Sequence, residues 1–94
     1  MSELDELSAE AEIGDAAKVF MESELGRMLL GMAEQEGEVA RLALETVDPD
    51  NKKEITRLQN QAALGRMFKV WLEELIDRGN VALEIYRNEK RIEQ

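Results

Sequence analysis

Acidic side chains are the residues of this 94-residue chain whose type and number could most readily do chemistry, as a general acid–base pair or as metal ligands. Helical bundles that hold two metal ions combine carboxylates with a glutamate–histidine motif. The chain has 21 Asp and Glu residues but no histidine, so a solvated acidic face explains them better. We therefore expect no metal, no cofactor and no catalytic residue among the candidate carboxylates, which are Glu34, Glu38, Glu73, Glu74 and Asp77.

The segment Asp48–Asn51 is the one stretch that resembles a calcium loop. Such a loop needs glycine at its sixth position and a bidentate glutamate at its twelfth. Lys53 and Gln59 occupy those positions, so the segment is interpreted as a turn that leads into a helix.

Nucleophilic and phosphate-binding motifs are missing from the sequence as well. There is no cysteine, no serine–base–acid set and no phosphate-cradling glycine loop. Arg27 and Arg66 could bind an acidic group, but pairing with nearby glutamates explains them more simply. Phe68 and Trp71 are interpreted as core or interface anchors rather than as part of a cofactor site. We expect that the protein is not an enzyme.

A short motif recurs after 39 residues. Leu25–Met28 returns as Leu64–Met67, and 43–45 returns as 82–84; eight of the 21 residues from Leu25 to Glu45 match their counterparts. Repeats of this length are typical of helical units that bury a face against each other. The offset predicts two similar helices, whether or not it reflects a true duplication.

Net charge is distributed unevenly along the chain. The total of −9 lies entirely in residues 1–47, which hold twelve acids and three bases, whereas 48–94 hold nine of each. An acidic surface disfavours direct binding to nucleic acid and favours either basic partners or simple solubility. The apolar runs are too short for a membrane span, and the acidic start is unlike a secretory signal, so we expect a cytoplasmic protein with no membrane partner.

Apolar spacing predicts an all-α fold in a single domain over residues 1–94. Residues 1–12 are expected to be flexible, the first helix to run over about 13–47, the turn over 48–51 with Asp48 as helix cap, and the second helix over about 51–90. Gly79 is a possible break, although continuity is favoured because apolar positions on both sides share one stripe. The tail after Arg87 is expected to fray.

Two long helices joined by a short turn predict an antiparallel helical hairpin. With the turn at 48–51, Leu44 should face Ile55, Met32 should face Met67, and Gln35 should face Leu64. Two helices cannot enclose a core, so we expect the hairpin to complete a bundle by homo-oligomerisation. The alternative is a monomer in which the N-terminal arm or the segment after Gly79 folds back as a third helix. The candidate interface residues are Met28, Met32, Gly37, Met67, Phe68, Trp71 and Leu75.

Glycines inside the predicted helices suggest close helix–helix contact, either in the same protomer or across an interface, because glycine otherwise costs about 1 kcal/mol against alanine in a helix. The alternative is that they make the helices flexible. Gly37 forms a strip of small residues with Ala33 and Ala40 at helical spacing. The other glycines interpreted in this way are Gly26, Gly31 and Gly65.

Several segments together resemble small, acidic, uncharacterised helical proteins of tailed bacteriophages. These are Glu24–Arg27, Val47–Pro49, Leu58–Asn60 and Phe68–Leu75, within about 55 residues of the chain. The resemblance implies a role in particle assembly or in host takeover, and no enzyme activity.

Two functions fit these observations. The first is a non-enzymatic, oligomeric helical protein that acts in assembly or as a structural component, in a phage particle if the resemblance holds. The alternative is an acidic inhibitor that mimics the charge of DNA and binds a basic or nucleic-acid-binding protein, which requires one continuous acidic surface over residues 3–38. A third interpretation, a small enzyme subunit or ligand-binding bundle, requires a buried polar pocket.

Overall fold

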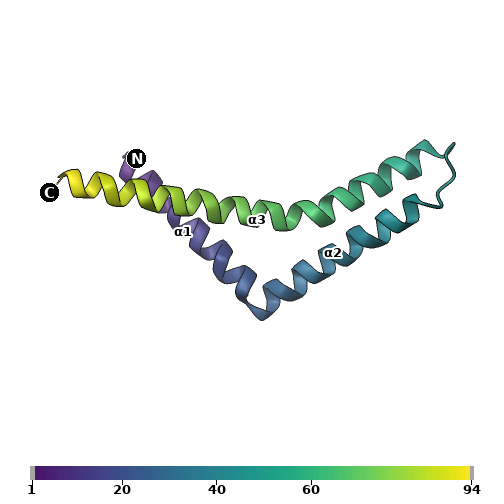
Figure 1. The fold of residues 1–94 in the computed structure, drawn as a ribbon, viewed down its shortest axis with the longest axis horizontal. Coiled ribbons are helices and arrows are strands. Elements are labelled where there is room, and N and C mark those ends of the chain that lie inside the picture. The colour runs from purple at the N-terminus through teal and green to yellow at the C-terminus, as the bar shows by residue number, and fades with distance from the viewer. Residues whose placement is uncertain (1, 94) are drawn as a thin grey trace. The chain divides into compact units, whose positions relative to one another are not determined.

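The structure, a computed structural model, describes residues 2–93 and is all-helical over that range, as predicted. Three α-helices follow one another, α1 (Glu3–Glu22), α2 (Glu24–Leu44) and α3 (Lys52–Glu93) (Figure 1). They form two compact units. The first contains Met1–Ser23 with Trp71–Gln94, and the second contains Glu24–Val70. Each unit therefore contains two helical segments. The part of α3 up to Val70 belongs to the second unit, and the part from Trp71 belongs to the first.

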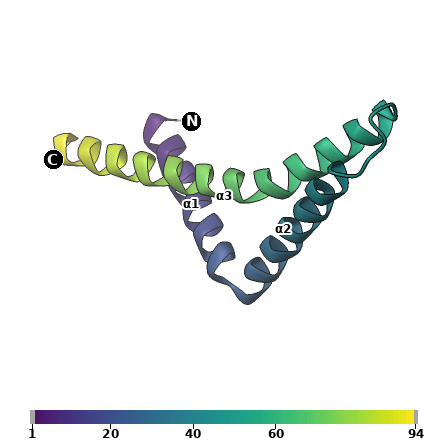
Figure 2. The same ribbon diagram turned by 45° about the vertical axis from the view of Figure 1, so that its right-hand side comes forward.

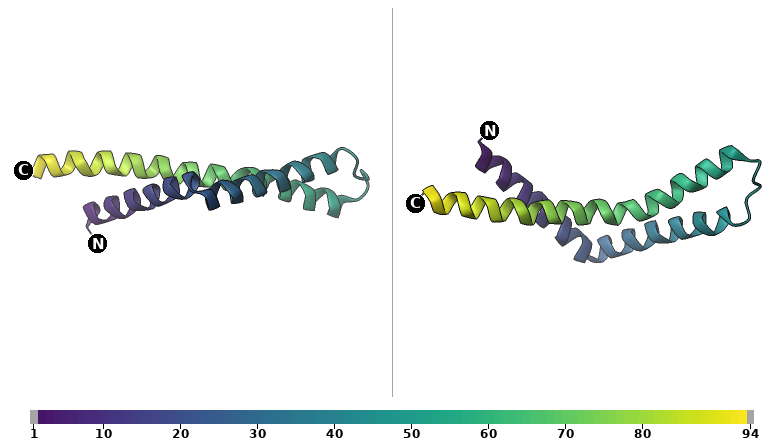
Figure 3. Two further views of the ribbon diagram at one scale, coloured as in Figure 1. Left: turned by 90° about the horizontal axis from the view of Figure 1, so that it is seen from below. Right: turned by 45° about the horizontal axis from the view of Figure 1, so that its top comes forward.

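In the second unit, α2 and the first half of α3 run in opposite directions on either side of a short turn (Figure 2). In the first unit, α1 runs antiparallel to the C-terminal half of α3 (Figure 3). The buried apolar residues of the two units are mostly small, and they are Ala17, Ala40, Leu58 and Ala82. No large side chain among residues 2–92 is fully buried.

The N-terminal segment differs from the expected flexible arm, because α1 begins at Glu3. The Ser2 hydroxyl caps this helix by accepting a hydrogen bond of 3.2 Å from the Asp5 amide. Acidic side chains in the first turn, including Glu3 and Glu6, interact favourably with the positive end of the helix dipole. Local capping thus orders a segment whose composition alone suggested disorder.

The helix expected over about 13–47 is instead two helices that meet at Ser23. Ser23 has an extended backbone with ψ of 158°, its amide donates to the carbonyls of Val19 and Phe20, and its hydroxyl donates to Phe20 at 2.6 Å. A serine side chain that bonds to the backbone of the preceding turn competes with helix continuation. Apolar periodicity continues across Ser23, which is why the pattern alone did not reveal the break.

The turn between α2 and α3 is fixed by two polar side chains. Asp48 Oδ1 accepts from the Asp50 amide at 2.9 Å, and Asn51 Oδ1 accepts from the Glu54 amide at 3.2 Å. Asn51 therefore caps α3, and the prediction of Asp48 as the cap was wrong. Asp48 instead closes the turn before the cap. Helix α2 ends at Leu44, three residues before the expected end.

Helix α3 continues through Gly79 without interruption, which confirms the favoured prediction. It extends to Glu93, although fraying after Arg87 was expected. Lys90 and Arg91 lie in the last turn, where basic side chains complement the negative end of the helix dipole. Lys90 also lies 5.3 Å from the centre of the Tyr86 ring, within range of a cation–π interaction. Gln94 lies outside the described residues.

Candidate interaction surface

Two glycines bring α2 and α3 together in the second unit. A Cβ atom added to Gly65 would lie 2.5 Å from the Ala33 carbonyl oxygen and 2.7 Å from the Cα of Gly37. A Cβ on Gly37 would lie 3.2 Å from the Cα of Gly65 and 3.3 Å from the Ala62 carbonyl oxygen. The absence of side chains at both positions lets the two backbones touch. Close packing at Gly37 and Gly65, predicted from the sequence, is confirmed.

The side of α2 that faces α3 is lined mainly by small residues at spacings of three and four. We call this the small seam; all its members are buried or half-buried, and they are Gly26, Leu30, Ala33, Gly37, Ala40 and Leu44. A seam of this spacing follows one side of a helix. Gly31 is not part of it, because a Cβ there would meet nothing within 4 Å. Gly31 therefore makes no close helix–helix contact within the described residues, and close packing there across an interface between copies stays a prediction.

Five other large apolar residues of α2 lie on nearly the opposite side of the helix. They also recur at spacings of three and four, which at about 3.6 residues per turn places them on one face, pointing away from the small seam. We call this face the α2 stripe, formed by Leu25, Met28, Met32, Gln35, Val39 and Leu42. Each of its apolar side chains is about half exposed or more, from 49% at Leu42 to 61% at Met28.

This arrangement contradicts two of the three side-chain pairings expected for the hairpin, Met32 with Met67 and Gln35 with Leu64. Met32 is 56% exposed, Leu64 is 59% exposed, and Gln35 is exposed as well, so these residues do not fill the contact between α2 and α3. The physical reason is the short distance between the axes of α2 and α3. Small residues allow a closer approach of the two axes than methionine or leucine, so the small seam makes the contact and the residues of the α2 stripe face outward.

The 39-residue repeat has a structural counterpart within the second unit. Gly26 and Gly65 are both buried, whereas the leucines before them, Leu25 and Leu64, are 60% and 59% exposed. The two copies of the motif therefore place glycine and leucine in matching environments, which agrees with the prediction of two similar helices.

The candidate interface residues fall into two groups. Met28 and Met32 are exposed members of the α2 stripe, and Trp71 in the first unit is 47% exposed. Gly37 is buried against Gly65, and the remaining candidates are half-buried, namely Met67, Phe68 and Leu75. The candidates predicted from the sequence did not include three exposed members of the α2 stripe, which are Leu25, Val39 and Leu42.

The first unit has a glycine contact of its own. A Cβ on Gly14 of α1 would lie 2.8 Å from both the Cα of Gly79 and the Leu75 carbonyl oxygen. An open groove beside this contact is lined by residues of both helices, namely Leu7, Glu10, Asp77, Arg78, Val81, Ala82 and Ile85. Most of the groove's lining is apolar, and the groove is open to solvent.

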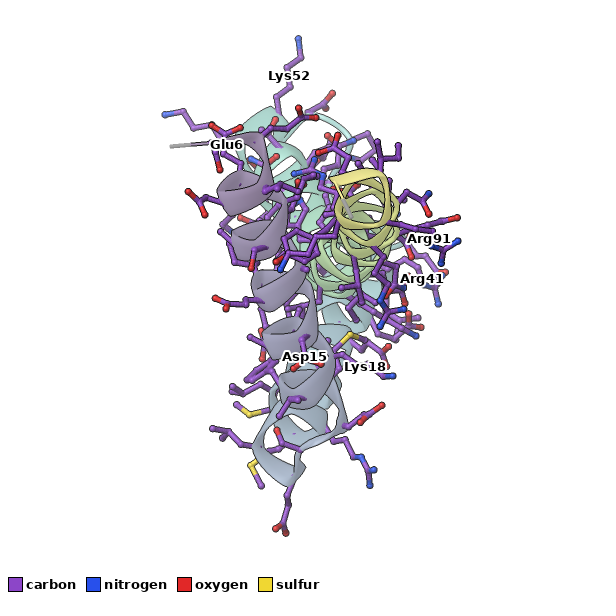
Figure 4. All side chains as sticks on the ribbon, turned by 90° about the vertical axis from the view of Figure 1, so that its left-hand side faces the viewer. Glu6, Asp15, Lys18, Arg41, Lys52 and Arg91 are labelled. Carbon is purple, nitrogen blue, oxygen red and sulfur yellow. The ribbon has the colours of Figure 1, made fainter. Side chains whose placement is uncertain are left out.

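Acidic residues line α1 on two sides rather than one. Glu3, Glu6 and Glu10 follow one side at helical spacing, while a second set follows the other side and contains Asp5, Glu12, Asp15 and Glu22. Figure 4 labels one member of each set, Glu6 and Asp15, with side chains that project outward from α1. The buried residues Gly14 and Ala17 follow Glu10 at spacings of four and seven, so they lie on the same side of α1 as the first set. Among residues 2–93, no group of three or more acidic side chains is placed to hold a metal ion.

Two arginine–glutamate pairs lie on the exposed surface of the second unit. Arg41 donates to Glu38 at 2.5 Å and lies 3.6 Å from Glu45, and Arg57 donates to Glu54 at 2.5 Å. The hydrogen bond from each arginine, with its positive charge, lowers the pKa of Glu38 and of Glu54 below the ordinary value. Because all these side chains are exposed, the pairs contribute little to stability.

Comparison with protein families, with curated proteins and with solved structures finds no match to this chain. Within residues 2–93, no helix has an apolar stretch long enough to cross a membrane.

Proposed function

We propose that this protein is a non-enzymatic helical interaction protein that works as a homo-oligomer in assembly or as a structural component. The observation that carries the proposal is the α2 stripe. Its five large apolar side chains are about half exposed or more, on the side of α2 that points away from its partner helix. A contiguous apolar surface on a small protein marks an interaction site, because leaving it in water is unfavourable.

The hairpin of α2 and α3 is, in this proposal, half of a larger bundle. Its internal contact uses small residues, so the pair buries few large side chains by itself. A second helix pair that covered the α2 stripe would supply the apolar burial that the contact between α2 and α3 lacks. The resemblance to small helical phage proteins suggests particle assembly as the process.

The alternative, an acidic inhibitor that mimics DNA, requires one continuous acidic surface. The acids of α1 lie in two sets on different sides of the helix, and one of these is the side that packs against α3 in the first unit. This arrangement favours solubility over charge mimicry as the reason for the acidic residues.

Sedimentation equilibrium over a range of micromolar concentrations tests the proposed function. We expect a mass that is a defined multiple of the 10.7 kDa chain. A chain that remains a monomer at high micromolar concentration would refute the proposal, because the α2 stripe would then stay exposed in the working protein.

A further inference from the structure

We infer that the α2 stripe is the contact with a second copy of this chain, and that the two α2 helices lie parallel and in register. This inference rests on the proposed function and names the surface and geometry of the oligomer. It follows from three features of the stripe, which are its spacing, its single polar member and the charges that flank it.

The spacing of the stripe is that of a coiled-coil seam. Leu25, Met32 and Val39 lie seven residues apart, and Met28, Gln35 and Leu42 form the second series of the same repeat. Such a seam accepts another helix of the same repeat, with each side chain inserted between those of the facing helix. The half-exposed side chains of the stripe are available for this contact without any change in the second unit.

Gln35 identifies the partner as a second copy. Its exposed amide stands in the middle of an otherwise apolar seam, and an apolar partner would bury it without a hydrogen bond. In a parallel, in-register pair, Gln35 faces Gln35 of the second copy, and each amide can donate to the other and accept from it. In an antiparallel pair centred on the stripe, Gln35 would instead face Met32. A polar residue at one seam position is known to fix register in this way.

The charges beside the stripe support the same geometry. In a parallel pair, the residues that flank the seam meet as Glu24 with Leu29, Gly31 with Glu36, and Glu38 with Ala43, so no acid faces another acid. The antiparallel pair would bring Glu24 close to Glu45, and like charges at such positions are unfavourable.

Some of the flanking acids have partners inside the chain. Glu38 and Glu45 share Arg41, which offsets part of their charge, and Glu36 accepts a hydrogen bond of 3.3 Å from Gln61 Nε2. The stripe itself carries no charged residue, so the contact surface is suited to an apolar seam with a copy of itself.

Single cysteines test the geometry directly, because the natural chain has no cysteine. Met28→Cys and Val39→Cys each place one thiol in the stripe, and Glu34→Cys places one on exposed surface outside it as a matched control. After mild oxidation, we expect each stripe variant to form a disulfide-linked dimer by itself, at least tenfold more than the control. Circular dichroism checks that each variant keeps the helical content of the natural chain.

The other outcomes each overturn the inference in a distinguishable way. Cross-linking only when Met28→Cys and Val39→Cys are mixed would mean antiparallel helices. An oligomer by mass in which neither stripe variant cross-links above the control would reject the stripe and leave the proposed function standing, whereas a monomer would reject both. A monomer that binds a synthetic helix with leucines in its seam and lysines beside it, and loses that binding with Met32→Lys, would assign the stripe to a basic partner.

Discussion

Gly37 of α2 and Gly65 of α3 pack backbone against backbone, so that a Cβ on Gly65 would stand 2.7 Å from the Cα of Gly37. This contact determines which face of α2 is used inside the chain. Because the helices meet mainly through small residues, most of the bulky apolar residues of α2 remain on the outside. The glycine contact and the exposure of the α2 stripe therefore both follow from the packing of α2 against α3 through small residues.

Gly65→Ala should destabilise the protein by about 1–3 kcal/mol, the usual cost of forcing an added methyl into a packed contact. The new Cβ would meet backbone atoms, the Ala33 carbonyl oxygen and the Cα of Gly37, which move only if the helices separate. Gly37→Ala should cost less, because its nearest contacts lie at 3.2 and 3.3 Å. Urea unfolding followed by circular dichroism, at one protein concentration, measures both.

Gly31→Ala is the matched control for these variants. A Cβ at Gly31 would meet nothing within 4 Å, so the substitution should stabilise α2 by about 1 kcal/mol through helix propensity alone. If Gly65→Ala proved as favourable as Gly31→Ala, the close contact between Gly37 and Gly65 would be wrong.

Gly14→Ala and Gly79→Ala should be coupled in the first unit. Each added Cβ would lie 2.8 Å from the Cα of the other glycine, so either methyl alone must push α1 and α3 apart. Once the helices have separated, the second methyl costs less. The double variant should therefore lose at least about 0.5 kcal/mol less stability than the two single variants together. Strictly additive losses in a double-mutant cycle would mean that the two glycines do not share a contact.

Arg41→Gln should raise the pKa of Glu38 back towards its ordinary value of 4.5, because the arginine lowers it through a hydrogen bond and its charge. A carboxyl whose folded pKa is lowered stabilises the protein above its unfolded pKa, and that contribution is lost as the pH falls through the folded value. The loss should be small and should shrink further in salt, since both side chains are exposed.

Side-chain carboxyl NMR against pH measures this shift, and Glu54, which pairs with Arg57, provides an internal control in the same sample. Glu38 should move in Arg41→Gln while Glu54 should not. An unchanged titration of Glu38 would show that the pair with Arg41 does not persist in solution.

Local signals in the sequence predicted much of this fold. Composition and apolar spacing gave the helical class, Asp48–Asn51 marked the turn, and continuity through Gly79 was predicted correctly. The break at Ser23 was missed because it depends on a serine hydroxyl bonding to the preceding turn, which leaves no trace in apolar periodicity.

The apolar pattern could not predict which face of α2 packs against α3. The pattern identifies which residues favour burial, but not whether the same chain or another copy buries them. The sequence feature that indicates which face of α2 packs against α3 is the strip of Ala33, Gly37 and Ala40, whose small size permits close approach. The backbones touch at that strip, so it has no room for bulky side chains. The face of α2 that packs against α3 is therefore not the one expected from hydrophobicity alone.

The mass of Met32→Lys, compared with that of the natural chain at the same concentration, tests most directly whether the α2 stripe is an interface. Met32 and Leu64 are exposed to nearly the same extent, at 56% and 59%, but only Met32 belongs to the stripe, so Leu64→Lys is the matched control. We predict that the natural chain and Leu64→Lys share a defined oligomeric mass and that Met32→Lys has the mass of a monomer. Equal masses for Met32→Lys and the natural chain would contradict the account.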